Sequence, residues 1–188
     1  APGRTADADF RVAMEAISER NYMGIALRTT LFNAADDATD YAQLAGRLRH
    51  LVGMVRRKQN IHGERIFIGG VGRAATIALR LGLSQPQWFA GVIAPGAEVL
   101  PCPDAHQPLL REFRQLSGKR VLLGSFNDVS EQASRTTDVA RLLHSSGMRV
   151  CERRYGSLQH PPREMYTDID RWIMRCCVPW CLATTSST

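Results

Sequence analysis

The sequence lacks the features that would place it in a membrane or a fibre. Its apolar residues never approach the ~18 in a row that a membrane-spanning helix needs. The first residues contain no apolar stretch of the kind found in a secretory signal peptide. Glycine (15) and proline (9) occur at ordinary frequencies, which excludes collagen-like and low-complexity chains. A chain of 188 residues is expected to form one globular domain with its own core.

The cysteines follow neither a disulfide nor a zinc pattern. They number five, at Cys102, Cys151, Cys176, Cys177 and Cys181. An odd number, with three crowded near the end, makes a poor disulfide framework. Paired C-x-x-C halves, which a zinc site would need, are absent. The sequence therefore predicts free thiols, no metal and a reducing, cytoplasmic location.

Lysine is nearly absent, because it supplies only Lys58 and Lys119 of the 24 basic residues, against 18 acidic ones. The net charge is +6. The basic residues are scattered along the chain, and their densest groups are Arg47/Arg49/Arg56/Arg57/Lys58 and Arg153/Arg154. Interleaved aromatic residues or a recognisable module, typical of nucleic-acid binding, are missing. We therefore expect no nucleic-acid partner.

Hydrophobic periodicity predicts helices that alternate with strands. Helices are expected at 7–20, from Thr39 or Asp40 to about Arg57, and at 74–81, 131–145 and 163–175. Short apolar runs predict strands at 22–27, 65–69, 89–94, 120–124 and 148–155. The fold class is therefore α/β, with a three-layer, doubly wound, mostly parallel sheet of about five strands. We expect a single domain over 1–175 and a tail over 176–188.

Residues that could carry chemistry follow three of these strands, where parallel α/β sheets bind their ligands. A glycine-rich turn ending at Gly72 comes first and opens a helix. Asp128 and His160 follow the two later strands. A sharp strand-to-helix turn, an acid and a histidine, in this order, are the three parts of an α/β-hydrolase triad.

From Asn60 to about Met174 the sequence resembles the α/β-hydrolase superfamily, in its carboxylesterase, phospholipase and dienelactone-hydrolase-like branch. The resemblance is carried by Asn60-Ile-His-Gly-Glu-Arg-Ile-Phe-Ile-Gly-Gly70, by Pro86-Gln-Trp-Phe-Ala-Gly-Val-Ile-Ala94 and by Lys119-Arg-Val-Leu-Leu123 with Asp128. It implies that Asp128 and His160 occupy active-site positions. It also implies that Arg73 supplies a backbone N–H to an oxyanion hole.

The G-x-S-x-G elbow of that family falls on Gly70-Val-Gly-Arg-Ala74, so Gly72 holds the nucleophile position. Glycine has no side-chain atom that could attack an acyl carbon. The resemblance then implies a degenerate member that binds a small ester or acyl ligand or acts in regulation, with some N-terminal strands missing. The alternative is a carboxylic ester hydrolase with another nucleophile, for which Ser125, Ser157 and Cys151 are the candidates.

The same turn also fits G-x-G-x-x-A, the pattern of dinucleotide-binding folds, from Gly70 to Ala75. The next strand should then end in an acidic residue for the ribose, whereas it ends at Pro95-Gly96. A dinucleotide-binding module is therefore a second alternative, and we expect no cofactor. The sequence leaves open whether the chain forms a homo-oligomer or binds a protein partner.

Overall fold

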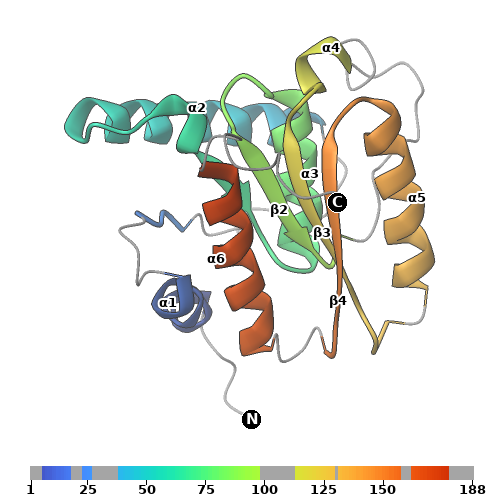
Figure 1. The fold of residues 1–188 in the computed structure, drawn as a ribbon. Coiled ribbons are helices and arrows are strands. Elements are labelled where there is room, and N and C mark those ends of the chain that lie inside the picture. Colours follow the sequence, from blue (N-terminus) through green and yellow to red (C-terminus); the bar gives the residue numbers. More distant parts are fainter. Residues whose placement is uncertain are drawn as a thin grey trace, which may run out of the picture. The chain divides into compact units, whose positions relative to one another are not determined.

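The structure, a computed structural model, describes residues 6–17, 23–26, 38–97, 113–129, 131–157 and 162–177 (Figure 1). Its elements are α1 (Ala6–Ile17), α2 (Ala38–Lys58), the 3-10 helix η3 (Gly63–Arg65), β1 (Phe67–Gly69), α3 (Arg73–Ser84), β2 (Gly91–Pro95), α4 (Phe113–Leu116), β3 (Arg120–Phe126), α5 (Gln132–Ser145), β4 (Arg149–Tyr155) and α6 (Arg163–Cys177). Most of the expected elements are therefore present within two or three residues of their predicted bounds.

The chain divides into two compact units. One comprises Ala1–Gly24 with Arg163–Thr188, and the other comprises Ile25–Pro162. In the first, α6 contacts α1 and buries Met165, Ile169 and Ile173 along one face, at helical spacing. The second holds every described strand. The single domain over 1–175 stays a prediction, and the tail lies almost wholly outside the described residues.

The second unit is built on a parallel sheet with the strand order β1-β2-β3-β4. Each strand pairs with the next one along the chain, with Phe67 opposite Gly91 and Arg120 opposite both Gly91 and Arg149. Parallel neighbours need a crossover connection, which α3 supplies between β1 and β2 and α5 between β3 and β4. This arrangement confirms the predicted α/β class.

Both faces of the central strands are buried. On one face, Val92 and Val121 join a core with Leu79 of α3 and Leu143 of α5. The alternate residues, which point to the opposite face, are also buried, and they include Ile93, Leu122 and Phe126. Continuous apolar runs such as Gly91–Pro95 are typical of strands covered on both sides.

The strand predicted at 22–27 is wrong for the residues that the structure describes there. Residues 23–26 form neither helix nor strand, and Met23 and Ile25 are 55% and 47% exposed. A short apolar run becomes a strand only when a neighbouring strand bonds its backbone groups, and no described strand pairs with this one. The short helix α4 was not predicted from the sequence.

Candidate functional site

The turn between β1 and α3 has the sharp geometry that the elbow motif predicts. Gly72 adopts φ 61° and ψ −128°, a backbone conformation that residues other than glycine rarely adopt. A Cβ atom placed on Gly70 would lie 2.5 Å from both the carbonyl carbon and the carbonyl oxygen of Ala74. The two glycines therefore allow the strand to turn directly into the helix, with α3 beginning at Arg73.

Hydrogen bonds fix this elbow against β2. The Gly70 N–H donates to the carbonyl of Ile93 at 3.1 Å, and the Gly72 N–H donates to that of Pro95 at 2.9 Å. Gly72 is buried, whereas the side chain of Arg73 is exposed. Among the described residues none accepts a hydrogen bond from the Arg73 N–H, and the first turn of α3 has no acidic residue. The elbow therefore presents the positive end of a helix.

Gly96, directly after β2, joins the elbow to the end of β3. Its φ is 79°, and a Cβ there would lie 3.0 Å from the Gly72 nitrogen and 3.0 Å from the ring carbon Cε2 of Phe126. Its N–H donates to the carbonyl of Gly124 at 2.7 Å. In the sequence, Pro95-Gly96 indicates only the end of a strand. Its contact with the elbow arises from the parallel register and has no local sequence signal.

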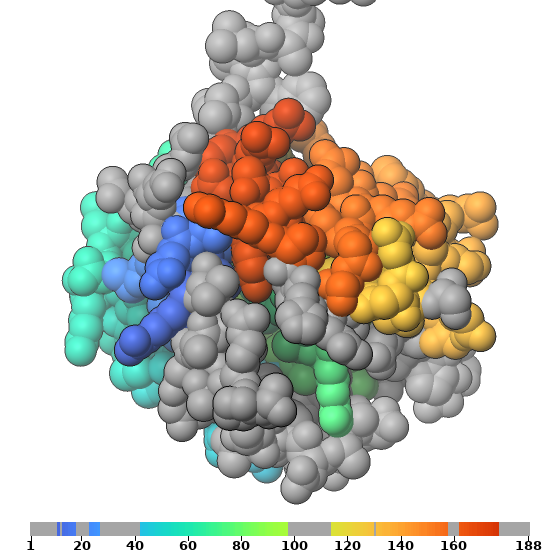
Figure 2. All heavy atoms as spheres, turned by 90° about the horizontal axis from the view of Figure 1, so that it is seen from below, coloured from blue at the N-terminus to red at the C-terminus, as the bar shows by residue number. Residues whose placement is uncertain are grey.

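The predicted acid lies where β3 and β4 end. The Asn127 N–H donates to the carbonyls of Tyr155 and Gly156 at 3.0 and 3.1 Å, which ties the two strand ends together. The carboxylate of Asp128 is exposed, and its Oδ2 accepts a hydrogen bond from the Ser157 hydroxyl at 2.7 Å. Figure 2 shows the underside of the molecule in Figure 1, where the yellow atoms around the end of β3 adjoin orange atoms.

A buried glutamine supports the turn that carries Asp128. Gln132, the first residue of α5, is 2% exposed, and its Oε1 accepts a hydrogen bond from the Phe126 N–H at 2.9 Å. Its Nε2 and the Oγ1 of Thr136, one turn further, are buried and have no hydrogen-bond partner among the residues that the structure describes. The sequence shows no sign of this role for Gln132, because the hydrogen bond to Phe126 depends on how the chain folds.

The other predicted residues lie in different places. His160 falls outside the described residues, so its place beside Asp128 stays a prediction. Ser125 is buried near the end of β3. Cys151 is partly buried and pairs with Leu122 in mid-strand, away from the strand ends. Among the three candidate replacement nucleophiles, Ser157 alone has a described carboxylate bonded to its reactive atom.

The dinucleotide interpretation of the turn gains little from this geometry. A pyrophosphate would need the open amides of the turn, but the Gly72 N–H is bonded to Pro95. The neighbouring strand β2 ends in Pro95, and no acidic side chain occupies its last residues. Within the described residues, no three His, Cys, Asp or Glu side chains gather closely enough to hold a metal ion. In the same part of the chain, every helix is too short or too polar to cross a bilayer.

The parallel sheet, its crossover helices and the glycine elbow define an α/β-hydrolase-like fold. Searches of protein families and of curated proteins found no match to the sequence. Solved structures do match.

The carboxylesterase of Bacillus cereus is 13% identical, with a TM-score of 0.66 over 89% of this chain and 82% of that one. SOBER1 of Arabidopsis thaliana is 14% identical, with a TM-score of 0.57 over 76% of this chain and 67% of that one. YahD, in a structure with malic acid, is 17% identical, with a TM-score of 0.58 over 74% and 65%. At these identities the likeness establishes the fold.

Proposed function

We propose that this chain is an esterase-type protein of α/β-hydrolase fold that binds a small carboxylate or ester and does not hydrolyse it. The observation that carries the proposal is Gly72. It occupies the point where the strand turns into the helix, with φ 61° and ψ −128°, and it has no side chain. An esterase of the elbow type forms its acyl-enzyme through a serine hydroxyl at that point. Without that atom the covalent route is closed.

The elbow keeps features that favour ligand binding. The open N–H of Arg73 and the N-terminus of α3 offer hydrogen-bond donors and a positive potential, which stabilise a carboxylate or an ester oxygen. Asp128, at the end of β3, and His160 would flank the ligand. YahD has been solved with malic acid, which makes malate a suitable first ligand for this site as well.

Two measurements test the proposal together. In ¹H–¹⁵N spectra titrated with malate, we expect the amide signals of Arg73 and Ala74 to shift, with no comparable change at Gly118, a turn glycine outside the elbow. A panel of p-nitrophenyl esters and a fluorophosphonate probe should show neither turnover nor labelling. Ester turnover that disappears in His160→Ala would contradict the proposal, because it would show an intact catalytic histidine.

The hydrogen bond between Ser157 and Asp128 favours one alternative, a carboxylic ester hydrolase with Ser157 as its nucleophile. The hydroxyl donates to the carboxylate at 2.7 Å, so Asp128 is placed to accept its proton as the oxygen attacks. Mass spectrometry of fluorophosphonate-treated protein decides the matter. A label on Ser157 that is lost in Ser157→Ala and kept in Ser134→Ala, on the exposed face of α5, would establish this alternative.

A further inference from the structure

The positive charge of the chain is concentrated on α2. Residues 42–63 contain five basic residues and no acidic one, and the acidic residue of α2, Asp40, lies in its first turn. The whole chain has a net charge of +6. The five are Arg47, Arg49, Arg56, Arg57 and Lys58, and each is exposed. The first acidic residue after them is Glu64, beyond the end of the helix. The sequence spacing alone made these arginines look scattered.

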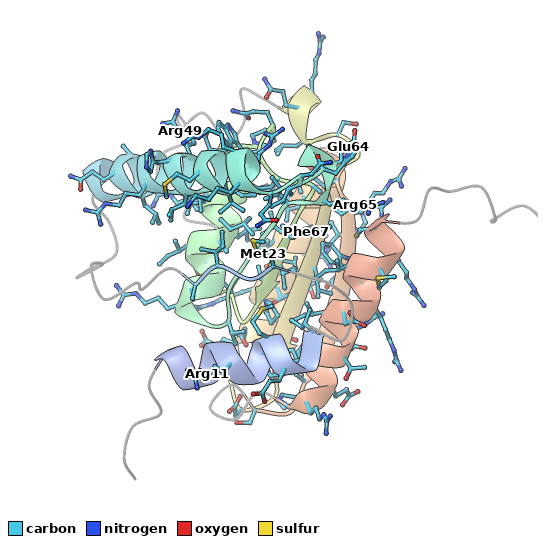
Figure 3. All side chains as sticks on the ribbon, turned by 90° about the vertical axis from the view of Figure 1, so that its left-hand side faces the viewer. Arg11, Met23, Arg49, Glu64, Arg65 and Phe67 are labelled. Atoms are coloured by element: carbon cyan, nitrogen blue, oxygen red, sulfur yellow. The ribbon has the colours of Figure 1, made fainter. Side chains whose placement is uncertain are left out.

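Helical packing explains why all five face solvent. Leu44 and Ala45 are buried against Leu81 of α3, and Val52, two turns further along α2, is buried as well. These residues lie on one side of the helix, so the remaining arc carries the basic side chains. In Figure 3, Arg49 is labelled on α2, and Glu64 and Arg65 follow its C-terminal end. We call this arc, from Ala42 to Lys58, the basic face of α2.

The cations of this face have no ion-pair partners among the described residues. The contrast with α5 is direct, since Arg135 bonds Glu131 at 2.6 Å and Arg141 bonds Asp138 at 3.3 Å. Unpaired like charges on one helix repel each other, and an anionic surface would relieve that repulsion. A partner of this face must therefore supply several negative charges together.

We propose that the basic face of α2 binds an anionic phospholipid surface. A cluster of four to eight Lys and Arg residues on an amphipathic helix is typical of binding to anionic lipid headgroups. Gly46 and Gly53 lie between the arginines, and a Cβ on Gly46 would have nothing within 4 Å. A Cβ on Gly53 would lie 3.6 Å from the guanidinium of Arg57, so an arginine side chain covers this part of the helix. Long arginine side chains can extend from there to a flat layer of headgroups.

A nucleic acid fits the same face less well. Single-stranded nucleic acids stack their bases on aromatic side chains, and residues 42–63 contain no Phe, Trp or Tyr. A duplex needs a module that carries its reading helix into a groove together with other backbone contacts. Lipid headgroups require only charge and access, which this face provides. The inference is independent of the ligand proposed for the elbow.

Co-sedimentation with vesicles tests the inference. The 188-residue chain should bind phosphatidylcholine vesicles in which about a third of the lipid is phosphatidylserine, and should not bind pure phosphatidylcholine. Binding should fall steeply between 0.1 and 1 M salt, because the Debye length shrinks from about 10 Å to about 3 Å. Failure to bind the anionic vesicles at low salt would overturn the proposal.

Charge variants assign the binding to α2. Arg56→Gln, Arg57→Gln and Lys58→Gln together should weaken binding on the order of 100-fold, because each basic residue near such a surface contributes about five-fold. The control removes the same charge elsewhere, through Arg114→Gln, Arg135→Gln and Arg141→Gln, and should lose far less. Equal losses in both triple variants would overturn the proposal, since net charge alone would then explain binding.

A substitution that strengthens vesicle binding provides a second test, because a folding defect would not strengthen binding. Gln43, exposed on α2, can become lysine at little cost in helix propensity. Gln43→Lys should strengthen vesicle binding about five-fold, and Ser134→Lys on α5 should not. Short duplex DNA serves as a competitor. If it binds more tightly than the vesicles and depends on the same three cations, the face is a nucleic-acid site and the proposal is wrong.

Discussion

The elbow at Gly70–Arg73 and the turn after β3 that carries Asp128, which we call the acid turn, lie at the same edge of the sheet. They are held in place by different means. At the elbow, backbone atoms contact backbone atoms, with Gly70 against Ala74 and Gly96 against Gly72. At the acid turn, side chains make the contacts, with Gln132 bonding Phe126 and Ser157 bonding Asp128. An elbow shaped by backbone packing can keep its form when the residue at its apex loses its side chain. A turn held by side chains depends on each of them.

The largest effect is expected at the elbow. Gly70→Ala places a methyl group 2.5 Å from backbone atoms of Ala74, which no side-chain movement can relieve. We expect a loss of about 3 kcal/mol or more in the free energy of unfolding, as for other overpacked sites. Chemical denaturation measures it. The matched control is Gly46→Ala on α2, where a Cβ meets nothing and a stabilisation of about 0.5–1 kcal/mol is expected. Equal effects of both substitutions would contradict the elbow packing.

The next largest loss of stability is expected at the acid turn, when its buried residue Gln132 is replaced. Gln132→Leu replaces the polar side chain by an apolar one of similar size, and it leaves the buried N–H of Phe126 without its acceptor. We expect a net loss of about 1–2 kcal/mol, because the cost of an unsatisfied buried donor is partly offset by removal of the buried Nε2, which has no partner among the described residues. Thermal unfolding followed by circular dichroism measures it. An unchanged melting temperature would show that the hydrogen bond does not hold the turn.

One turn further along α5, we expect a substitution to raise the free energy of unfolding instead of lowering it. Thr136 buries a hydroxyl for which the described part of the chain offers no hydrogen-bond partner. Thr136→Val keeps the branched shape and removes the unpaired group, so the protein should gain about 1 kcal/mol of stability. The same unfolding experiment, run beside Thr137→Val as a partly exposed control, measures it. A destabilised Thr136→Val protein would mean that the hydroxyl does have a partner.

The smallest effect is expected at the exposed end of the turn. Ser157→Ala removes the hydrogen bond to Asp128, whose carboxylate is exposed. Water can replace the hydroxyl there, so the loss should be about 0.5 kcal/mol. Urea denaturation resolves a change of this size when wild type and variant are measured together. A loss as large as that of Gln132→Leu would show that side chains at the surface hold the turn as firmly as buried ones.

The sequence predicted the features that depend on local pattern. The glycines at 70 and 72 mark the elbow because a sharp turn needs them, and the apolar runs 89–94 and 120–124 mark buried strands. Contacts between distant segments could not be predicted in this way. The Asp128–Ser157 bond joins residues 29 positions apart, and the contact of Gly96 with Gly72 depends on strand register. That the arginines of α2 lack ion-pair partners among the described residues likewise appears only once the helix is packed.

Gly72→Ser tests the central claim most directly, namely that the elbow lacks only its nucleophile. Gly72→Ala is the control for backbone strain, because both side chains must accept φ 61° at a cost of about 1–3 kcal/mol. After incubation with a fluorophosphonate probe, folded Gly72→Ser protein should carry a covalent label on residue 72, and wild type and Gly72→Ala should carry none there. A folded Gly72→Ser variant that stays unlabelled would contradict the account, because the elbow would then not present a reactive serine.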